Sequence, residues 1–290
     1  ALTLALVVGC IGAGAARLKP DLSLEAFFGG EAEADRAYEA YRGFWGFDDA
    51  MVVVVVQADG DILTHARMER LAEVAGDLLD DDAIADVDNI ATATWMQASG
   101  GGLTLETVGD SMPDPDEGPE AHAAWRARLL AESPFAPALI SEDGTSAAMM
   151  VRLDGDVGDI AQVVPLVGAL RAQLAKHEGQ DGLRYVEAGI PAVRTDFFEA
   201  FYQDQIVFFP VMLGIILLAL ALTLRRVHGI VVPMVAAMVP LVMVLGVMGY
   251  LGAPLDIVSQ LLLTLLPSIA VADAIHLVGR FHEELRKRSE

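Results

Sequence analysis

Two titratable residues, Asp273 and His276, interrupt an apolar stretch near the end of the sequence. The stretch is Leu261–Arg280, LLLTLLPSIAVADAIHLVGR, which is apolar enough to cross a bilayer. A carboxylate at the centre of a membrane costs about 2.5–3.5 kcal/mol or more, so such groups usually lie where ions or protons move. Helix positions three apart share one face, which predicts that both side chains project together into a helix bundle. They are therefore candidates for a proton relay in which the imidazole shares the proton of the carboxylate.

The same residues also have structural interpretations. Asp273 could be an acid that a neighbouring helix satisfies, and His276 a hydrogen-bonded histidine near the cytoplasmic boundary. Thr264, Pro267 and Ser268 precede Asp273 in the same stretch. Hydroxyl groups in membrane helices can satisfy the carbonyl that a proline leaves free. We expect Thr264 and Ser268 to hydrogen-bond Asp273 or to bring water to it.

No other pattern in the sequence predicts catalysis or metal binding. Asp110, Asp114, Asp116 and Glu117 lie close together, but they lack the frame and terminal Glu of an EF-hand, so a solvated loop is expected. The six histidines show no metal-binding spacing, and no phosphate-binding GxxxxGKS or GxxxxGKT motif is present. We therefore predict no enzymatic activity, no metal site and no cofactor.

Charge and hydrophobicity are segregated along the chain. The 290 residues are 54% hydrophobic and carry a net charge of −22. Residues 18–204 contain 36 acidic and 12 basic residues, whereas residues 205–290 contain five acidic and six basic ones. This segregation predicts an acidic aqueous domain joined to a membrane domain, and the acidic balance argues against nucleic-acid binding. The one cysteine, Cys10, excludes an intrachain disulfide.

Residues 17–204 are expected to form the aqueous domain, an α+β fold of the ferredoxin-like type. Strands are predicted where apolar, often β-branched residues run together, and helices where apolar residues recur every three to four positions. Two β-α-β units result, with the helices on one face of the sheet. Residues 99–145, between these units, are expected to be less regular, with one helix near 120–131. The predicted elements are strands at 51–57, 84–90, 147–153 and 184–188, and helices after Thr64 and across 160–174.

The remaining residues are predicted to lie in or beside a membrane. Residues 1–16 are apolar but shorter than the roughly 20 residues that a spanning helix needs, so they are interpreted as the end of a first transmembrane helix. The alternative is a secretory signal, because Val7–Cys10 resembles a bacterial lipobox. Three further spans are predicted at about 205–224, 229–251 and 257–279, followed by a cytoplasmic segment at 280–290.

Basic residues predict the orientation of these spans. Arg225 and Arg226 separate the first two of the three, and Arg280 and the basic segment 286–288 follow the third. The positive-inside rule places these ends in the cytoplasm. We therefore expect a multi-pass protein of the inner (plasma) membrane with residues 17–204 outside the cytoplasm, in a periplasm if the cell has one.

The residues around Asp273 resemble a known motif. Ile269–Leu277, IAVADAIHL, followed by GRFHEE at 279–284, is similar to the fourth transmembrane helix of the resistance-nodulation-division (RND) superfamily of transporters. The most similar branch is the lipid-exporter-like group that includes the mycobacterial large membrane proteins (MMPL) and hopanoid transporters. That branch often has a Gly-Val-Asp-Tyr core, whereas Ala272 and Ala274 flank Asp273 here. The order of predicted elements is also similar: one helix, a large outside domain, then three helices with Asp on the last.

The resemblance implies a membrane α-helical bundle with an inserted extracytoplasmic, porter-like domain. It also implies an exporter of hydrophobic or amphiphilic molecules, lipids among them, that is driven by the proton motive force, with Asp273 as the relay acid. Such transporters have twelve helices in two repeats, so the sequence is interpreted as an N-terminal part. The expected partners are the remaining helices, membrane lipids, the substrate and further copies of the protein. Two alternatives stay open: a non-transporting sterol-sensing-type or secretion-accessory protein of the same architecture, and a purely structural membrane-anchored binding domain.

Overall fold

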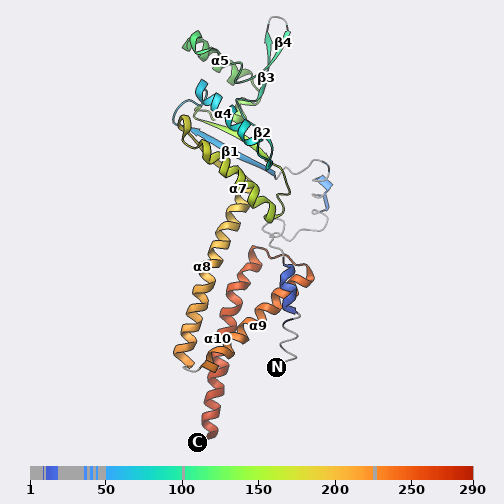
Figure 1. The fold of residues 1–290 in the computed structure, drawn as a ribbon, viewed down its shortest axis with the longest axis vertical. Helices are drawn as coiled ribbons and strands as arrows, with labels where there is room; N and C mark the ends of the chain where they lie inside the picture. Colours follow the sequence, from blue (N-terminus) through green and yellow to red (C-terminus); the bar gives the residue numbers. More distant parts are fainter. Residues whose placement is uncertain are drawn as a thin grey trace. The chain divides into compact units, whose positions relative to one another are not determined.

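The computed structural model of the chain describes residues 9, 11–18, 36–37, 40–41, 44, 50–99, 102–224 and 227–289. The chain divides into two compact units (Figure 1). We call residues 38–196 the sheet unit, and residues 1–37 together with 197–290 the helical unit.

The sheet unit is built around a four-stranded antiparallel sheet. Strand β1 lies between β5 and β6, so that Val54 is opposite both Met149 and Glu187, and the strand order is β2-β5-β1-β6. Helix α4 connects β1 to β2, and α7 connects β5 to β6. This is the split β-α-β arrangement of ferredoxin-like folds, so the predicted topology is confirmed. The bounds are β1 Met51–Ala58, α4 His65–Leu79, β2 Ile84–Asp88, β5 Ser146–Leu153, α7 Ile160–His177 and β6 Leu183–Ala188.

The core of the sheet unit lies between one face of the sheet and the two helices. Val52, Val54 and Val56 of β1 are fully buried, whereas Val53 and Val55 on the opposite face are only partly buried. The continuous valine run predicts a strand, and this strand is buried on the one face where α4 and α7 pack together. The core-facing side chains of the helices are Met68, Leu71, Val74, Ala75, Leu78, Ile160, Val163, Val167, Leu170 and Leu174.

A buried asparagine joins the end of β2 to α4. Asn89 is fully buried. Its Oδ1 accepts hydrogen bonds from the backbone N–H groups of Ala91 (2.8 Å) and Thr92 (3.1 Å). Its Nδ2 donates to the carbonyl of Leu71 at 3.0 Å. The side chain therefore satisfies backbone polar groups in the buried and partly buried region between β2 and α4.

The segment between the two β-α-β units is more regular than predicted. It contains a hairpin of β3 (Thr94–Ser99) and β4 (Gly102–Thr107), and the expected helix is α5 (Pro119–Glu132). Of the three glycines at 100–102 that predict a loop, Gly102 begins β4, and Gly100 and Gly101 lie outside the described residues. Trp95 of β3 is buried, and the guanidinium carbon of Arg128 in α5 lies 5.4 Å from its ring centroid. The short elements η3 (Pro115–Glu117) and α6 (Ala136–Leu139) complete this segment.

Helix α8 (Ile190–Leu224) begins in the sheet unit, where two arginines fix its first turns. Arg171 of α7 bonds Glu187 of β6 at 2.5 Å and Asp196 of α8 at 2.6 Å. Arg194 donates to the carbonyl of Val157 at 2.9 Å. These bonds attach the start of α8 to the sheet.

The helical unit contains η1 (Ala13–Arg17), the rest of α8, α9 (Val227–Leu251) and α10 (Ile257–Ser289). Each predicted span lies in a helix, but α8 and α10 are longer than their spans, and the predicted segment 280–290 continues α10 as far as Ser289. By length and hydropathy, Ile190–Leu222 and Pro233–Leu251 are candidates to cross a membrane. The apolar part of α10, Leu261–His276, is shorter than a full span.

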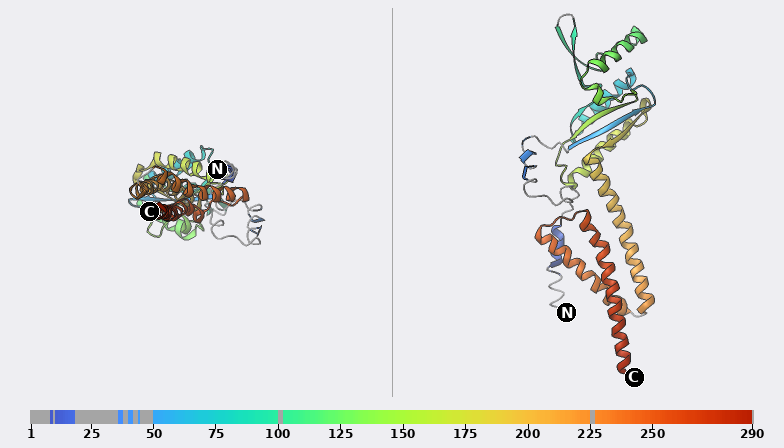
Figure 2. Two further views of the ribbon diagram at one scale, coloured as in Figure 1. Left: turned by 90° about the horizontal axis from the view of Figure 1, so that it is seen from below. Right: turned by 180° about the vertical axis from the view of Figure 1, so that it is seen from behind.

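Glycines bring η1 and α9 into close contact (Figure 2). A Cβ atom at Gly246 would overlap the carbonyl oxygen of Ile11, and one at Gly249 would overlap that of Gly14. Small residues permit such close helix contacts in membranes. The guanidinium carbon of Arg17 also lies 5.1 Å from the ring centroid of Tyr250. Residues 11–17 are helical, as predicted for the end of a first helix, while residues 1–8 and 10 lie outside the described residues.

Candidate functional site

Helix α10 carries Asp273 and His276 on an exposed side. Leu261, Leu265 and Ile269 precede them at four-residue intervals and are also exposed. This spacing follows one stripe of an α-helix. The structure therefore places the predicted pair on the same stripe, although no hydrogen bond or ion pair among the described residues joins the two side chains.

The opposite side of α10 is the packed side. Val271 is buried at 4% exposure and forms a small core with Leu220 of α8, which is fully buried. Ile216 of α8 and Ile230 and Met234 of α9 pack around this pair. The described parts of α8 and α9 thus cover one side of α10 and leave the stripe with Asp273 uncovered.

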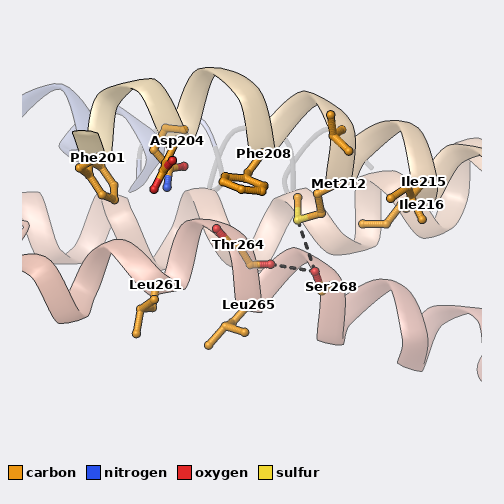
Figure 3. A pocket seen from close by; sticks show the side chains of 12 residues that line it. Phe201, Asp204, Phe208, Met212, Ile215, Ile216, Leu261, Thr264, Leu265 and Ser268 are labelled. Atoms are coloured by element: carbon orange, nitrogen blue, oxygen red, sulfur yellow. Dashed lines mark hydrogen bonds between the residues drawn. The ribbon is translucent and has the colours of Figure 1, made fainter. Parts of the chain in front are cut away.

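Thr264 and Ser268 lie away from Asp273, contrary to the supporting role predicted for them. The Ser268 hydroxyl donates to the backbone carbonyl of Thr264 at 2.8 Å, and its oxygen is 3.4 Å from the sulfur of Met212 in α8 (Figure 3). The reason is helix geometry, since each residue turns the helix by about 100°. Five residues separate Ser268 from Asp273 and nine separate Thr264 from it, which turns both hydroxyls to other sides of the helix.

An uncovered carboxylate needs a partner if α10 lies in a membrane. The cost of about 2.5–3.5 kcal/mol or more applies to a charge that faces lipid, and membrane carboxylates therefore face bundle interiors or water. Ala272, next to Asp273, is exposed as well. Small side chains on a helix face let another helix approach closely. The face around Asp273 thus has the composition of a helix-packing surface with a titratable group in it.

The acidic loop of the sheet unit makes local hydrogen bonds. The Asp110 carboxylate accepts from the Thr107 hydroxyl at 2.7 Å, and Glu117 accepts from the backbone N–H of Asp114 at 3.4 Å. The His65 ring is 2.7 Å from the carbonyl of Pro113, which it can bond as a donor. Among the described residues, no group of three metal-ligating side chains is close enough to hold an ion. The loop is therefore held by its own turn and by α4.

A second feature of the helical unit was not predicted. Asp204 and Gln205 of α8 lie at one end of a groove between α8 and α10, and Thr264 and Ser268 lie in its wall. The sequence contains one signal for this groove: Asp204 comes just before the long apolar run at 206–224. Its second wall comes from residues more than fifty positions later, which a local pattern does not reveal.

These features define a class of protein. Long apolar helices, one of which has an exposed face with two titratable residues, and a separate acidic sheet unit are the parts of a membrane protein with a large aqueous domain. Residues 31–290 match the model of the MMPL family, and the chain therefore belongs to this family. The predicted relationship to RND-type transporters is confirmed by this match. The curated proteins gave no match.

Proposed function

We propose that the chain is part of an RND-type exporter that uses the proton motive force to move hydrophobic or amphiphilic molecules, lipids among them. The observation that carries this proposal is the position of Asp273 and His276 on the uncovered side of α10. Membership of the MMPL family supports a transporter in preference to an enzyme.

In this proposal Asp273 is covered by further transmembrane helices. A carboxylate in a packed, nearly dry interior strongly prefers a cationic partner when ionised and a neutral partner when protonated. Loading a proton from the outside and releasing it inside would therefore change which helix arrangement is favoured. A transporter needs this link between protonation and packing, because a ligand shifts a conformational equilibrium only through its different affinity for the two states.

The orientation is part of the same proposal. The basic residues that follow α8, and those in the last part of α10, would lie in the cytoplasm under the positive-inside rule. The sheet unit would then lie on the other side of the inner membrane, in the periplasm. Cysteines introduced at exposed positions such as Asp110 would test this by labelling from each side of the membrane. Labelling of position 110 from the cytoplasmic side alone would contradict it.

The central test is export by the full-length protein with Asp273→Asn. Asparagine keeps the size of aspartate and most of its hydrogen bonding, but it cannot carry a proton. We expect insertion to be normal and export driven by a pH gradient to be lost. Asp256→Asn is a matched control, because Asp256 accepts from the N–H of Ser259 at 2.6 Å at the start of α10 and asparagine caps helices equally well.

The result also separates the alternatives. A membrane-anchored binding domain predicts that Asp273→Asn has no effect. A non-transporting accessory protein predicts an activity that depends on a partner, without flux of any substrate. Export that persists in Asp273→Asn at the wild-type rate would refute the proton relay.

A further inference from the structure

A groove of about 620 Å³ lies between α8 and α10 (Figure 3). Both walls belong to the helical unit. Its volume is within the range of small-molecule sites in proteins, about 300–1,000 Å³. Its α10 wall contains Thr264 and Ser268 together with Leu261 and Leu265 of the exposed stripe, but neither Asp273 nor His276 lines it.

Leu220 of α8 and Val271 of α10 form a buried contact beyond the groove, and the Ser268 oxygen and the Met212 sulfur lie 3.4 Å apart within its lining. Around this contact the large apolar side chains stay open: Phe208 (59% exposed), Ile215 (63%) and Leu265 (54%) line the groove. Large apolar side chains left open in this way on a membrane helix can contact hydrocarbon without cost.

The lining is mostly apolar, and its polar residues are Asp204, Gln205, Thr264 and Ser268. Asp204 lies beside Phe201 near one end of the groove (Figure 3), Gln205 follows it in α8, and none of the twelve lining residues is basic. In the wall, the Ser268 hydroxyl already donates a hydrogen bond to the carbonyl of Thr264, so it needs no hydrogen-bond acceptor from a ligand. From Asp204 to Ile215 the helix rises about 17 Å, close to the roughly 15 Å of one leaflet of a 30 Å hydrocarbon core.

We propose that this groove binds one acyl chain of an amphiphile whose head group is a cation or a hydrogen-bond donor. The chain would lie against Phe208, Ile215 and Leu265, and the head group would bond the Asp204 carboxylate and the Gln205 amide. Charge complementarity selects this class, because an anionic head group would meet a carboxylate with no cation in the lining to offset it. The assignment of this molecule as a substrate rests on the proposed function, but its binding does not require transport.

Binding can be measured on the full-length protein in vesicles of zwitterionic lipid. All three native tryptophans, at 45, 95 and 125, lie outside the apolar spans, so a tryptophan placed in the groove is a local reporter. We would use Ile215→Trp, with Leu218→Trp as the matched control, because Leu218 is equally exposed on α8 (60%) but does not line the groove. The probes are octadecylamine and stearic acid, both brominated along the chain so that they quench tryptophan on contact.

The amine is expected to quench Ile215→Trp saturably, while Leu218→Trp is quenched only in proportion to the amount of probe in the membrane. Adding Asp204→Asn should weaken amine binding at least about threefold and leave quenching by the acid unchanged. Leu261→Trp, on the other wall of the groove (Leu261 is 57% exposed), repeats the measurement if Ile215→Trp does not insert.

Three results would overturn the proposal. Equal quenching by amine and acid, or no effect of Asp204→Asn, would mean that the groove holds ordinary lipid without recognising its head group. A groove tryptophan that neither probe quenches would mean that protein fills the space. Asp273→Asn is expected to keep amine binding. Loss of export with amine binding retained therefore tests the proton relay of the proposed function. Loss of amine binding with export retained tests only the groove.

Discussion

Substitution of the buried Asn89 is expected to be among the most damaging single changes in the sheet unit. Asn89→Ala removes three hydrogen bonds with backbone groups, two from the N–H groups of Ala91 and Thr92 to Oδ1 and one from Nδ2 to the carbonyl of Leu71, and a longer one from the Thr92 hydroxyl to Oδ1 at 3.4 Å. Each of the three backbone bonds is worth about 1 kcal/mol net, and the buried N–H of Ala91 that loses its acceptor costs about 1–3 kcal/mol more. We therefore expect the free energy of unfolding to fall by about 4–6 kcal/mol, a large part of the 5–15 kcal/mol typical of a domain.

The assay follows from where the tryptophans lie. All three are within residues 38–196, so tryptophan fluorescence during urea unfolding of the full chain in detergent reports on the sheet unit. Asp88→Ala, at the exposed neighbouring position, is the control and should change the free energy by no more than about 0.5 kcal/mol. A loss below about 1 kcal/mol in Asn89→Ala would refute this account of the buried hydrogen bonds.

A second substitution at the same position gives a pH-dependent result. Asn89→Asp keeps the acceptor for Ala91 and Thr92 but turns a second oxygen toward the carbonyl of Leu71, where only a protonated carboxyl can donate. Its pKa in the folded state is therefore expected to be raised above the unfolded value. The stability of this variant should be greatest below the unfolded pKa of about 4 and should fall as pH rises through the folded pKa. Stability that does not change with pH relative to the wild type would contradict this.

The remaining predictions concern other parts of the chain. His276→Ala should lower export and shift its pH dependence if the imidazole shares the proton of Asp273; full activity with an unchanged pH profile would remove His276 from the relay. Gly246→Leu should separate η1 from α9, because any side chain there overlaps the carbonyl of Ile11. The protein should then lose thermal stability in detergent. Val247→Leu, at the exposed next position, should leave the thermal stability unchanged. Burial raises the pKa of Tyr185 to about 12. The neutral phenol therefore stabilises the fold fully below the unfolded pKa of about 10, and this contribution is lost as pH rises toward 12. Tyr185→Phe should reduce the loss of stability between pH 10 and pH 12 by about 1–2 kcal/mol, after allowance for the partial exposure of the side chain.

The ferredoxin-like sheet could be predicted because its pattern is local and repeated. Each β-α-β unit has a strand of apolar residues and a helix with one apolar face, and two such units have few ways to combine. The hairpin of β3 and β4 was missed because its strands alternate weakly: Met96, Leu103 and Leu105 are apolar but exposed. Trp95 packs inward, and its contact with Arg128 joins residues that are far apart in sequence.

The candidate site was predictable in part. The i, i+3 spacing of Asp273 and His276 was enough to place them on one stripe of α10. Thr264 and Ser268 were expected to hydrogen-bond Asp273 or to bring water to it, but the turn of 100° per residue directs their hydroxyls to other sides of α10, and the Ser268 hydroxyl bonds the Thr264 carbonyl. The groove could not be predicted, because it depends on how far α8 and α10 separate between Phe201 and Leu220.

The position of β1 in the sheet has a consequence for how the protein is made. Its two neighbours come late in the chain, since Val54 pairs with Met149 and with Glu187. Contacts between residues so distant in sequence form slowly, because the loop between them must first be closed. The sheet closes only when β6 has been synthesised, and α8 begins two residues after β6 ends. Closure of the sheet and insertion of α8 therefore fall at the same stage of synthesis, and a delay in either leaves apolar strand surface open to aggregation.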